Sequence, residues 1–136
     1  MLHAFRSQAF DRPVVSNTSR LLDYLRFDMG SDRVETVRVL HLNARLMLLR
    51  DEVVGEGTVD EAPVYVREIT RRALELGSTA LIMVHNHPSG DPEPSRADID
   101  VTKRLGRACE LFRIHLHDHF IVTARGHSSM RAMGLL

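Results

Sequence analysis

The sequence predicts an α/β domain in which a central mixed sheet is flanked by helices. Segments with the two-residue period of strands alternate with segments of helical period, and the apolar run at residues 79–84 is typical of a strand buried on both faces. A chain of 136 residues with 43% hydrophobic content suits one core. We expect one domain over residues 17–136, preceded by an N-terminal arm over residues 1–16 that could mediate homodimerisation.

The first predicted element is a helix over residues 18–29, where leucines recur at helical spacing. Asn17 or Thr18 would cap its N-terminus, and Gly30 would end it. A first helix of about three turns follows.

A β-meander is predicted next. Residues 36–42, TVRVLHL, alternate as in a strand with one face in the core, and Asn43 begins a hairpin turn. Residues 46–60 predict one or two further strands, in which Gly55 and Gly57 suggest a bulge or a bend.

The middle of the chain predicts helix, strand, loop and helix. Apolar residues three and four apart indicate a helix that ends at Gly77, and the buried strand 79–84 follows it. Prolines interrupt regular structure until Ser95, where a third helix begins. Counting back three residues from Val101 on its apolar stripe gives Asp98, so a carboxylate faces the core in the first turn.

The C-terminal part predicts one long strand and a turn at Gly126. The pattern RIHLHDHFIVTA alternates, so four apolar residues are expected on one face: Ile114, Leu116, Phe120 and Val122. The three histidines between them would share the other face. Cys109, on the third helix, is expected to be a small buried hydrophobic residue.

Charge and cysteine content exclude several classes of protein. Lys plus Arg equals Asp plus Glu at 18 each, which disfavours a dedicated nucleic-acid binder. A single cysteine excludes an internal disulfide and a multi-cysteine zinc site. Because no apolar run could span a bilayer or serve as a signal peptide, we expect a cytoplasmic protein without membrane association.

A metal site is predicted after the buried strand. His85 and His87 flank one residue, so their side chains can reach one ion. Asp98 would supply a third ligand and leave a fourth position open for water, as in catalytic zinc sites. Paired histidines of this kind can also be structural, and a first-turn Asp98 can simply stabilise the helix dipole.

Hydrolysis at such a site needs a base and an oxyanion donor. Glu35, at the entrance to the first strand, is the candidate base, although the sequence also allows Glu52, Glu56 or Glu61. Ser95 could be only the N-cap of the third helix, or its hydroxyl could also donate to the oxyanion.

The run His85-x-His87-Pro88, followed by Ser95-x-x-Asp98, resembles the signature of the JAMM (MPN-plus) metallopeptidases, and HNHPSGDPEPS resembles their RadC-like branch. The resemblance covers about 100 residues from Glu35 onward and implies a mixed sheet of the cytidine-deaminase-like type. It implies zinc (Zn²⁺) ligands at His85, His87 and Asp98, Glu35 as catalytic base and Ser95 as oxyanion donor.

The resemblance also implies a function, which is zinc-dependent hydrolysis of peptide or isopeptide bonds in a peptide or protein substrate. Two alternatives remain open: a DNA-repair-associated protein that binds or processes DNA, and a noncatalytic scaffold. RadC-like proteins usually carry a helical domain before this one, and a chain of this length is expected to lack it.

Two further motifs are weaker. His85-Asn86-His87 spells HNH, but the nuclease motif of that name spreads its residues over a ββα-metal unit. The HLHDH at 115–119 lacks the spacing and the later histidines of a metallo-β-lactamase site. Within it, Asp118 and His119 match the RadC pattern and are expected to support the active site from behind the ligands.

Overall fold

The structure is a computed structural model that describes residues 13–56 and 62–136. Its elements are η1 (Val14–Asn17), α2 (Thr18–Met29), β1 (Thr36–Leu42), β2 (Leu48–Glu56), α3 (Ala62–Leu76), β3 (Ala80–Asn86), α4 (Arg96–Leu111), β4 (His115–Val122) and β5 (His127–Ser129). Most of the predicted arm, together with Gly57 and Glu61, lies outside the described residues.

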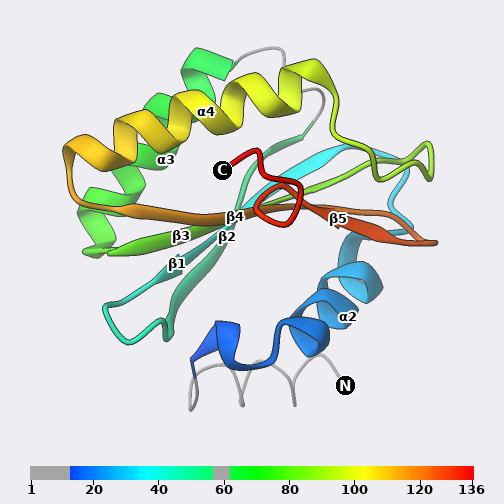
Figure 1. Cartoon of the computed structure of the whole chain (residues 1–136), viewed down its shortest axis with the longest axis horizontal. Coiled ribbons are helices and arrows are strands. Elements are labelled where there is room, and N and C mark those ends of the chain that lie inside the picture. Colours follow the sequence, from blue (N-terminus) through cyan, green and yellow to red (C-terminus); the bar gives the residue numbers. More distant parts are fainter. Residues whose placement is uncertain (1–12, 57–61) are drawn as a thin grey trace.

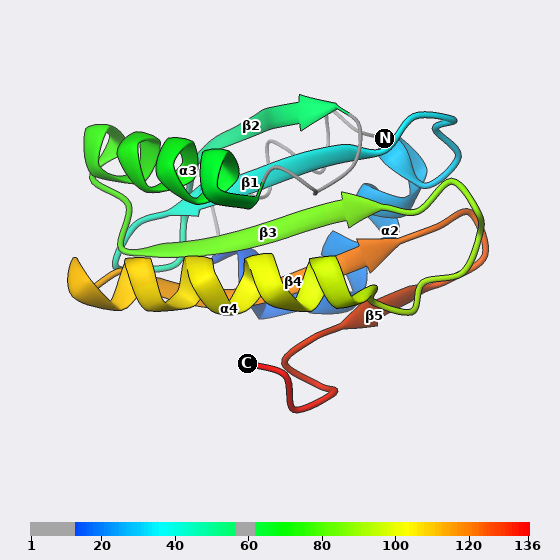
Figure 2. The same cartoon turned by 90° about the horizontal axis from the view of Figure 1, so that it is seen from above.

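One five-stranded sheet organises the domain. Its strand order is β2-β1-β3-β4-β5, with β3 and β4 parallel and the other neighbours antiparallel. Helices α3 and α4 cover one face and α2 covers the other (Figure 1), and the view from above shows α3 and α4 lying side by side over the strands (Figure 2). The predicted α/β fold with a mixed sheet flanked by helices is confirmed.

Two apolar cores fill the spaces on either side of the sheet. One joins α2 to strand residues such as Leu40, Ile82 and Phe120, and the other joins α3 and α4 to residues such as Val39 and Met83. Every residue of β3 is buried, as its apolar sequence predicts. The strand continues to Asn86, two residues beyond the predicted end.

Strand β1 differs from the prediction, because it is buried on both faces rather than on one. Val37 and Val39 belong to the core under α3 and α4, whereas the alternate positions face α2. Among these, Arg38 is 5% exposed and is held by the carboxylates of Asp28 in α2 and Asp51 in β2. The polar residue that suggested an open face is instead a paired buried cation.

Strand β4 also differs from the prediction, because its alternation breaks at His117. Leu81 pairs with Leu116, but the next residue of β3 pairs with Asp118, so His117 is an extra residue in the register. Leu116 therefore packs under α4, while Phe120 packs against α2. The expected single apolar face is wrong, and His119 is turned towards α4.

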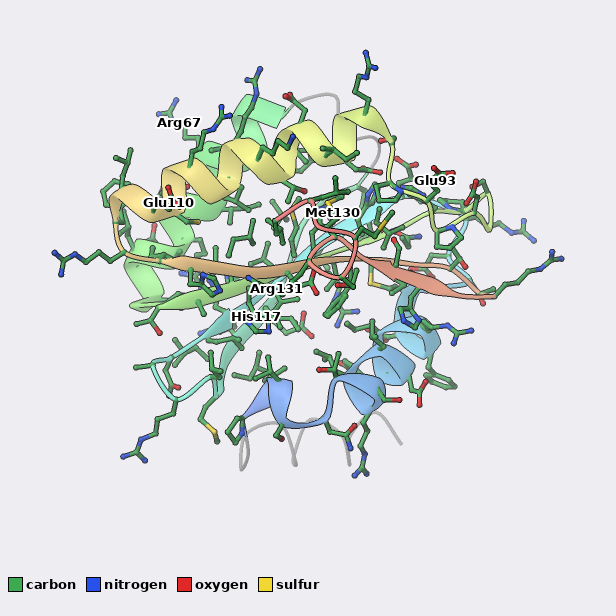
Figure 3. All side chains as sticks on the ribbon, viewed as in Figure 1. Arg67, Glu93, Glu110, His117, Met130 and Arg131 are labelled. Carbon is green, nitrogen blue, oxygen red and sulfur yellow. The ribbon has the colours of Figure 1, made fainter. Side chains whose placement is uncertain are left out.

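Asp118 fastens the end of β5 and the segment that follows it to β4. Its carboxylate accepts hydrogen bonds from the Ser129 hydroxyl (2.5 Å) and the Arg131 backbone N–H (3.1 Å). The Arg131 guanidinium donates to the carbonyl of His117, and Met130 is fully buried. Figure 3 shows Met130, Arg131 and His117 along this strip of the sheet.

The local signals for turns and caps agree with the structure. Asn17 caps α2 by accepting from the Arg20 N–H, and Gly77 ends α3 with a positive φ of 70°. A register shift beside Gly55 gives β2 its predicted bulge. Cys109 is fully buried, as expected. Among the described residues, no helix is long and apolar enough to cross a bilayer.

Candidate metal centre

Both histidines lie at the C-terminal end of strand β3. His85 occupies the end of β3 on the face that α3 and α4 cover, and His87 follows the strand, with its N–H bonded to the carbonyl of Val122. The two rings meet edge to face, with centroids 4.9 Å apart. The Nδ1 of His87 lies 2.9 Å from the Asp91 carbonyl, which orients the ring and leaves Nε2 towards the site.

Helix α4 brings Asp98 to the same place. Ser95 caps this helix and forms a capping box with Asp98: the Asp98 N–H donates to Ser95 Oγ (3.0 Å), and the Ser95 N–H donates to Asp98 Oδ2 (2.8 Å). Asp98 is fully buried, with Oδ1 3.0 Å from His85 Nδ1 and Oδ2 2.9 Å from His87 Nε2. The helix start therefore fixes the carboxylate between both imidazoles.

The charges at this site are strongly coupled. Burial would raise the pKa of Asp98, yet the imidazoles of His85 and His87 and the Ser95 N–H together hold that pKa well below its usual value. The Asp98 carboxylate, in turn, raises the pKa of His87 against the opposing effect of burial. Asp98 is therefore an anion at neutral pH, which is the form that binds a metal ion.

Unpartnered polar atoms test whether these residues fit a metal ion. Among the described side chains, four buried polar atoms lack a hydrogen-bond partner: His85 Nδ1, His85 Nε2, Asp98 Oδ1 and His119 Nε2. The 3.0 Å contact between His85 and Asp98 does not have hydrogen-bond geometry. All four atoms belong to this one place, and a buried polar atom left unpaired costs about 1–3 kcal/mol.

His85, His87 and Asp98 can hold a metal ion. Each offers one ligand atom, and these atoms all lie within 4.8 Å of one another. Two imidazoles and one carboxylate are a donor set that zinc accepts, with a fourth position left open. The residues present therefore fit a metal ion, which would satisfy the unpartnered ligand atoms.

Among the candidate glutamates that the structure describes, Glu35 is the one beside this site. Its Oε2 lies 3.7 Å from His85 Nε2, and its side chain is 30% exposed. Of the alternatives, Glu52 is instead bonded to Arg72 in α3. Glu56 pairs with Thr36 at the end of β2 and is exposed. Glu61 lies outside the described residues.

Asn86 fixes the position of Glu35, and sequence reasoning did not single it out. This fully buried side chain accepts from the Thr36 N–H (2.6 Å) and donates to the Val34 carbonyl (3.0 Å), so it grips the backbone on both sides of Glu35. The middle residue of the HNH run is therefore a backbone clamp. The amide was a usable signal, since the side chain of an asparagine can both donate and accept hydrogen bonds while it is uncharged.

Ser95 combines its capping role with an exposed position beside the ligands. Its Oγ accepts from the Asp98 N–H, so the hydroxyl proton remains available to another acceptor. The N-cap interpretation of Ser95 is thus realised in the structure.

His119 lies behind the ligands, because the register break at His117 turns its side chain towards α4. It is fully buried, its Nδ1 is 2.5 Å from Thr102 Oγ1, and its ring centroid is 6.3 Å from that of His85. Burial lowers the pKa of His119 to about 3, so the ring is neutral. Asp118 points away and fastens the C-terminal segment.

Comparisons with known proteins identify relatives of the whole domain. Residues 15–135 match the family model described as the RadC-like JAB domain. The chain is also 47% identical over 131 residues to the UPF0758 protein SPO0054 of Ruegeria pomeroyi. That alignment covers 96% of this chain and 58% of the relative, so the chain spans little more than half of the relative's length.

Proposed function

Because this chain belongs to the RadC-like JAB domain family, we propose that it is a zinc-dependent hydrolase of the JAMM type, which cleaves peptide or isopeptide bonds. One observation supports this most directly. The unpartnered buried atoms gather where His85, His87 and Asp98 can share an ion, and Glu35 approaches the same place.

The ligand set favours catalysis over a purely structural metal. Structural zinc sites are closed by four protein ligands, whereas catalytic sites use three and keep one position open. When bound, the ion supplies a Lewis acid that polarises a carbonyl oxygen and makes a nearby water more acidic.

Glu35 is the proposed general base. Its carboxylate, 3.7 Å from His85 Nε2 and partly exposed, can take a proton from the attacking water and return it to the departing amine. Asn86 keeps Glu35 in reach by holding the backbone before and after it. A base held on both sides loses little freedom when substrate binds.

Ser95 is the proposed oxyanion donor. Its Oγ accepts from the Asp98 N–H, which fixes the oxygen and leaves the hydroxyl proton free to donate. A preorganised donor of this kind stabilises the negative charge that develops on the carbonyl oxygen during attack.

Elemental analysis on protein purified without added metal and without a histidine tag is the first test. We expect about one zinc per chain in the wild type and loss of zinc in His87→Ala and Asp98→Ala. Wild type that neither contains nor takes up zinc would exclude this mechanism and favour a noncatalytic scaffold. Zinc-independent, salt-sensitive duplex binding would favour the DNA-associated alternative.

Hydrolysis of peptide and isopeptide substrate panels is the second test. Glu35→Gln should retain zinc and lower kcat by about 10²–10⁴-fold, the usual contribution of a general base. Glu56→Gln is the matched control, because this exposed glutamate ends the neighbouring strand, and its kcat should stay near wild type. Equal losses in both variants would contradict the role of Glu35.

A further inference from the structure

One of the four unpartnered atoms does not belong to the three ligands. His119 Nε2 is buried without a partner, like the two nitrogens of His85 and Oδ1 of Asp98. An ion can bind one nitrogen of His85 and Oδ1 of Asp98, and each His85 nitrogen also faces a carboxylate, of Asp98 or of Glu35. His119 Nε2 therefore needs an explanation of its own. His119 lies on β4, whereas the ligands come from β3 and α4, so the fold rather than proximity in sequence brings His119 Nε2 to this place.

The hydrogen bonds of Thr102 indicate which nitrogen of His119 carries the proton. The Thr102 hydroxyl donates its only proton to the Asp98 carbonyl, at 2.6 Å. Its other close contact, 2.5 Å from His119 Nδ1, must then be accepted from the ring. This pattern assigns the proton to Nδ1 and leaves Nε2 as a bare acceptor. The partner that Nε2 lacks is therefore a donor.

Two alternatives fit the geometry less well. The three ligand atoms lie within 4.8 Å of one another, and His119 falls outside that group, whereas zinc ligands sit only about 2 Å from the ion. A shift of the ring towards the ion would break its bond to Thr102. An ordinary core histidine, on the other hand, would have both nitrogens satisfied.

We propose that His119 positions the attacking water: its Nε2 accepts a hydrogen bond from the water that occupies the open position beside His85, His87 and Asp98. The inference rests on the proposed metal centre. Glu35 would take one proton of this water, and His119 would hold the other. Through Thr102, the same residue is also tied to the helix turn that carries Asp98.

Nitrogen NMR of histidine-labelled protein tests this directly. Long-range proton–nitrogen spectra, with His119 assigned by its loss in His119→Gln, should show Nδ1 protonated and Nε2 bare in metal-free protein. On addition of zinc, the Nε2 shift should change, while Nε2 stays unprotonated and outside the range of metal-bound nitrogens. The same addition to Asp98→Ala should leave His119 unchanged.

Each other result overturns the proposal. An Nε2 shift in the range of metal-bound nitrogens would make His119 a fourth ligand. No change in wild type that has taken up one zinc would make it a core residue, while the metal centre would stand. Failure of wild type to take up zinc would remove the metal centre and this inference together.

Conservative substitution provides a second, independent readout. His119→Gln keeps an acceptor at the side-chain end, whereas His119→Leu has none. Both should bind one zinc, but Leu should lower kcat by about 100-fold, in the range found for outer groups of metal sites, and Gln should recover about half of that loss on a logarithmic scale. Equal kcat values in Gln and Leu variants of equal thermal stability would contradict the proposal.

Discussion

Two buried histidines face the same helical layer from opposite ends of the sheet. His41 is the last residue but one of β1 and lies at one end of the sheet, the His41 end, whereas His85 is the last residue but one of β3 and lies at the other, the metal end; each is 1% exposed. His41 Nδ1 lies 2.9 Å from Ser78 Oγ, and its Nε2 is 3.9 Å from Glu52, which Arg72 holds. Neither nitrogen of His85 has a hydrogen-bond partner.

The difference shows how burial alone misleads. The two histidines are equally buried. His41 has a hydrogen-bond partner within the chain, whereas the nitrogens of His85 need a partner that the chain does not provide. Because unpaired buried groups are destabilising, the metal end should limit the stability of the metal-free protein. The contribution of the His41 end to stability should not depend on metal.

Zinc-dependent stability is the largest expected effect. At a zinc concentration 1,000 times Kd, binding to the folded state should stabilise the wild type by about 4.1 kcal/mol. His85→Ala should lower zinc affinity by more than about 100-fold, since outer groups of metal sites already contribute 10–100-fold, and should lose most of this stabilisation. Calorimetric unfolding with and without zinc measures both.

The matched variant is His41→Ala. It should lower the free energy of unfolding without metal by about 1–3 kcal/mol, because Ser78 loses its partner, and keep the full zinc-induced increase. A zinc-induced increase that vanished equally in His41→Ala and His85→Ala would contradict the division into two ends.

Acid sensitivity is the next largest effect, and His41 contributes to it. Burial lowers the pKa of His41 from its usual 6.5 to about 4, with Glu52 opposing that change and Arg72 and Arg50 adding to it. The unfolded chain therefore binds more protons than the folded protein between these values. Stability should fall as the pH is lowered from about 6.5 to 4, by about 3 kcal/mol at most.

Chemical denaturation of metal-free protein across this pH range measures the slope. His41→Gln removes the titrating group but keeps a polar side chain, so its slope should be smaller than that of the wild type. Because the remaining slope contains the other groups of the chain, the difference between the two curves is the relevant quantity. Parallel curves would show that His41 does not titrate with a depressed pKa.

The sequence was sufficient for the elements with strong local signals. The helix cap at Asn17, the glycine stop at Gly77 and the apolar run of β3 each depend on neighbouring residues. The three ligand positions could be predicted for a related reason: His85 and His87 share a strand end, and Asp98 begins the next helix.

The break in β4 could not be predicted from alternation, because one extra residue reverses every later position. Strict alternation places the charged Asp118 on one face with both Leu116 and Phe120, and that conflict was the available signal. The two faces of β1 were misjudged because Arg38 pairs with Asp28 and Asp51, and these two residues lie on other elements. The clamp by Asn86 is likewise a long-range contact.

Asn86 lies at the metal end, but its hydrogen-bond partners are within the chain. Asn86→Asp keeps an acceptor for the Thr36 N–H and loses the donor to the Val34 carbonyl, which frees one side of the Glu35 backbone. We expect kcat to fall about tenfold through displacement of the base, with zinc content and KM near wild type.

Asn86→Ala separates position from stability. It releases both sides of Glu35 and leaves two backbone groups unpaired, so kcat should fall further and the free energy of unfolding should drop by about 1–3 kcal/mol. If Asn86 acts only on stability, kcat per folded molecule will match wild type in both variants. If it positions Glu35, kcat will fall in Asn86→Asp even where the free energy of unfolding stays near that of the wild type. Asn86, whose partners are all within the chain, would then still support catalysis at the metal end.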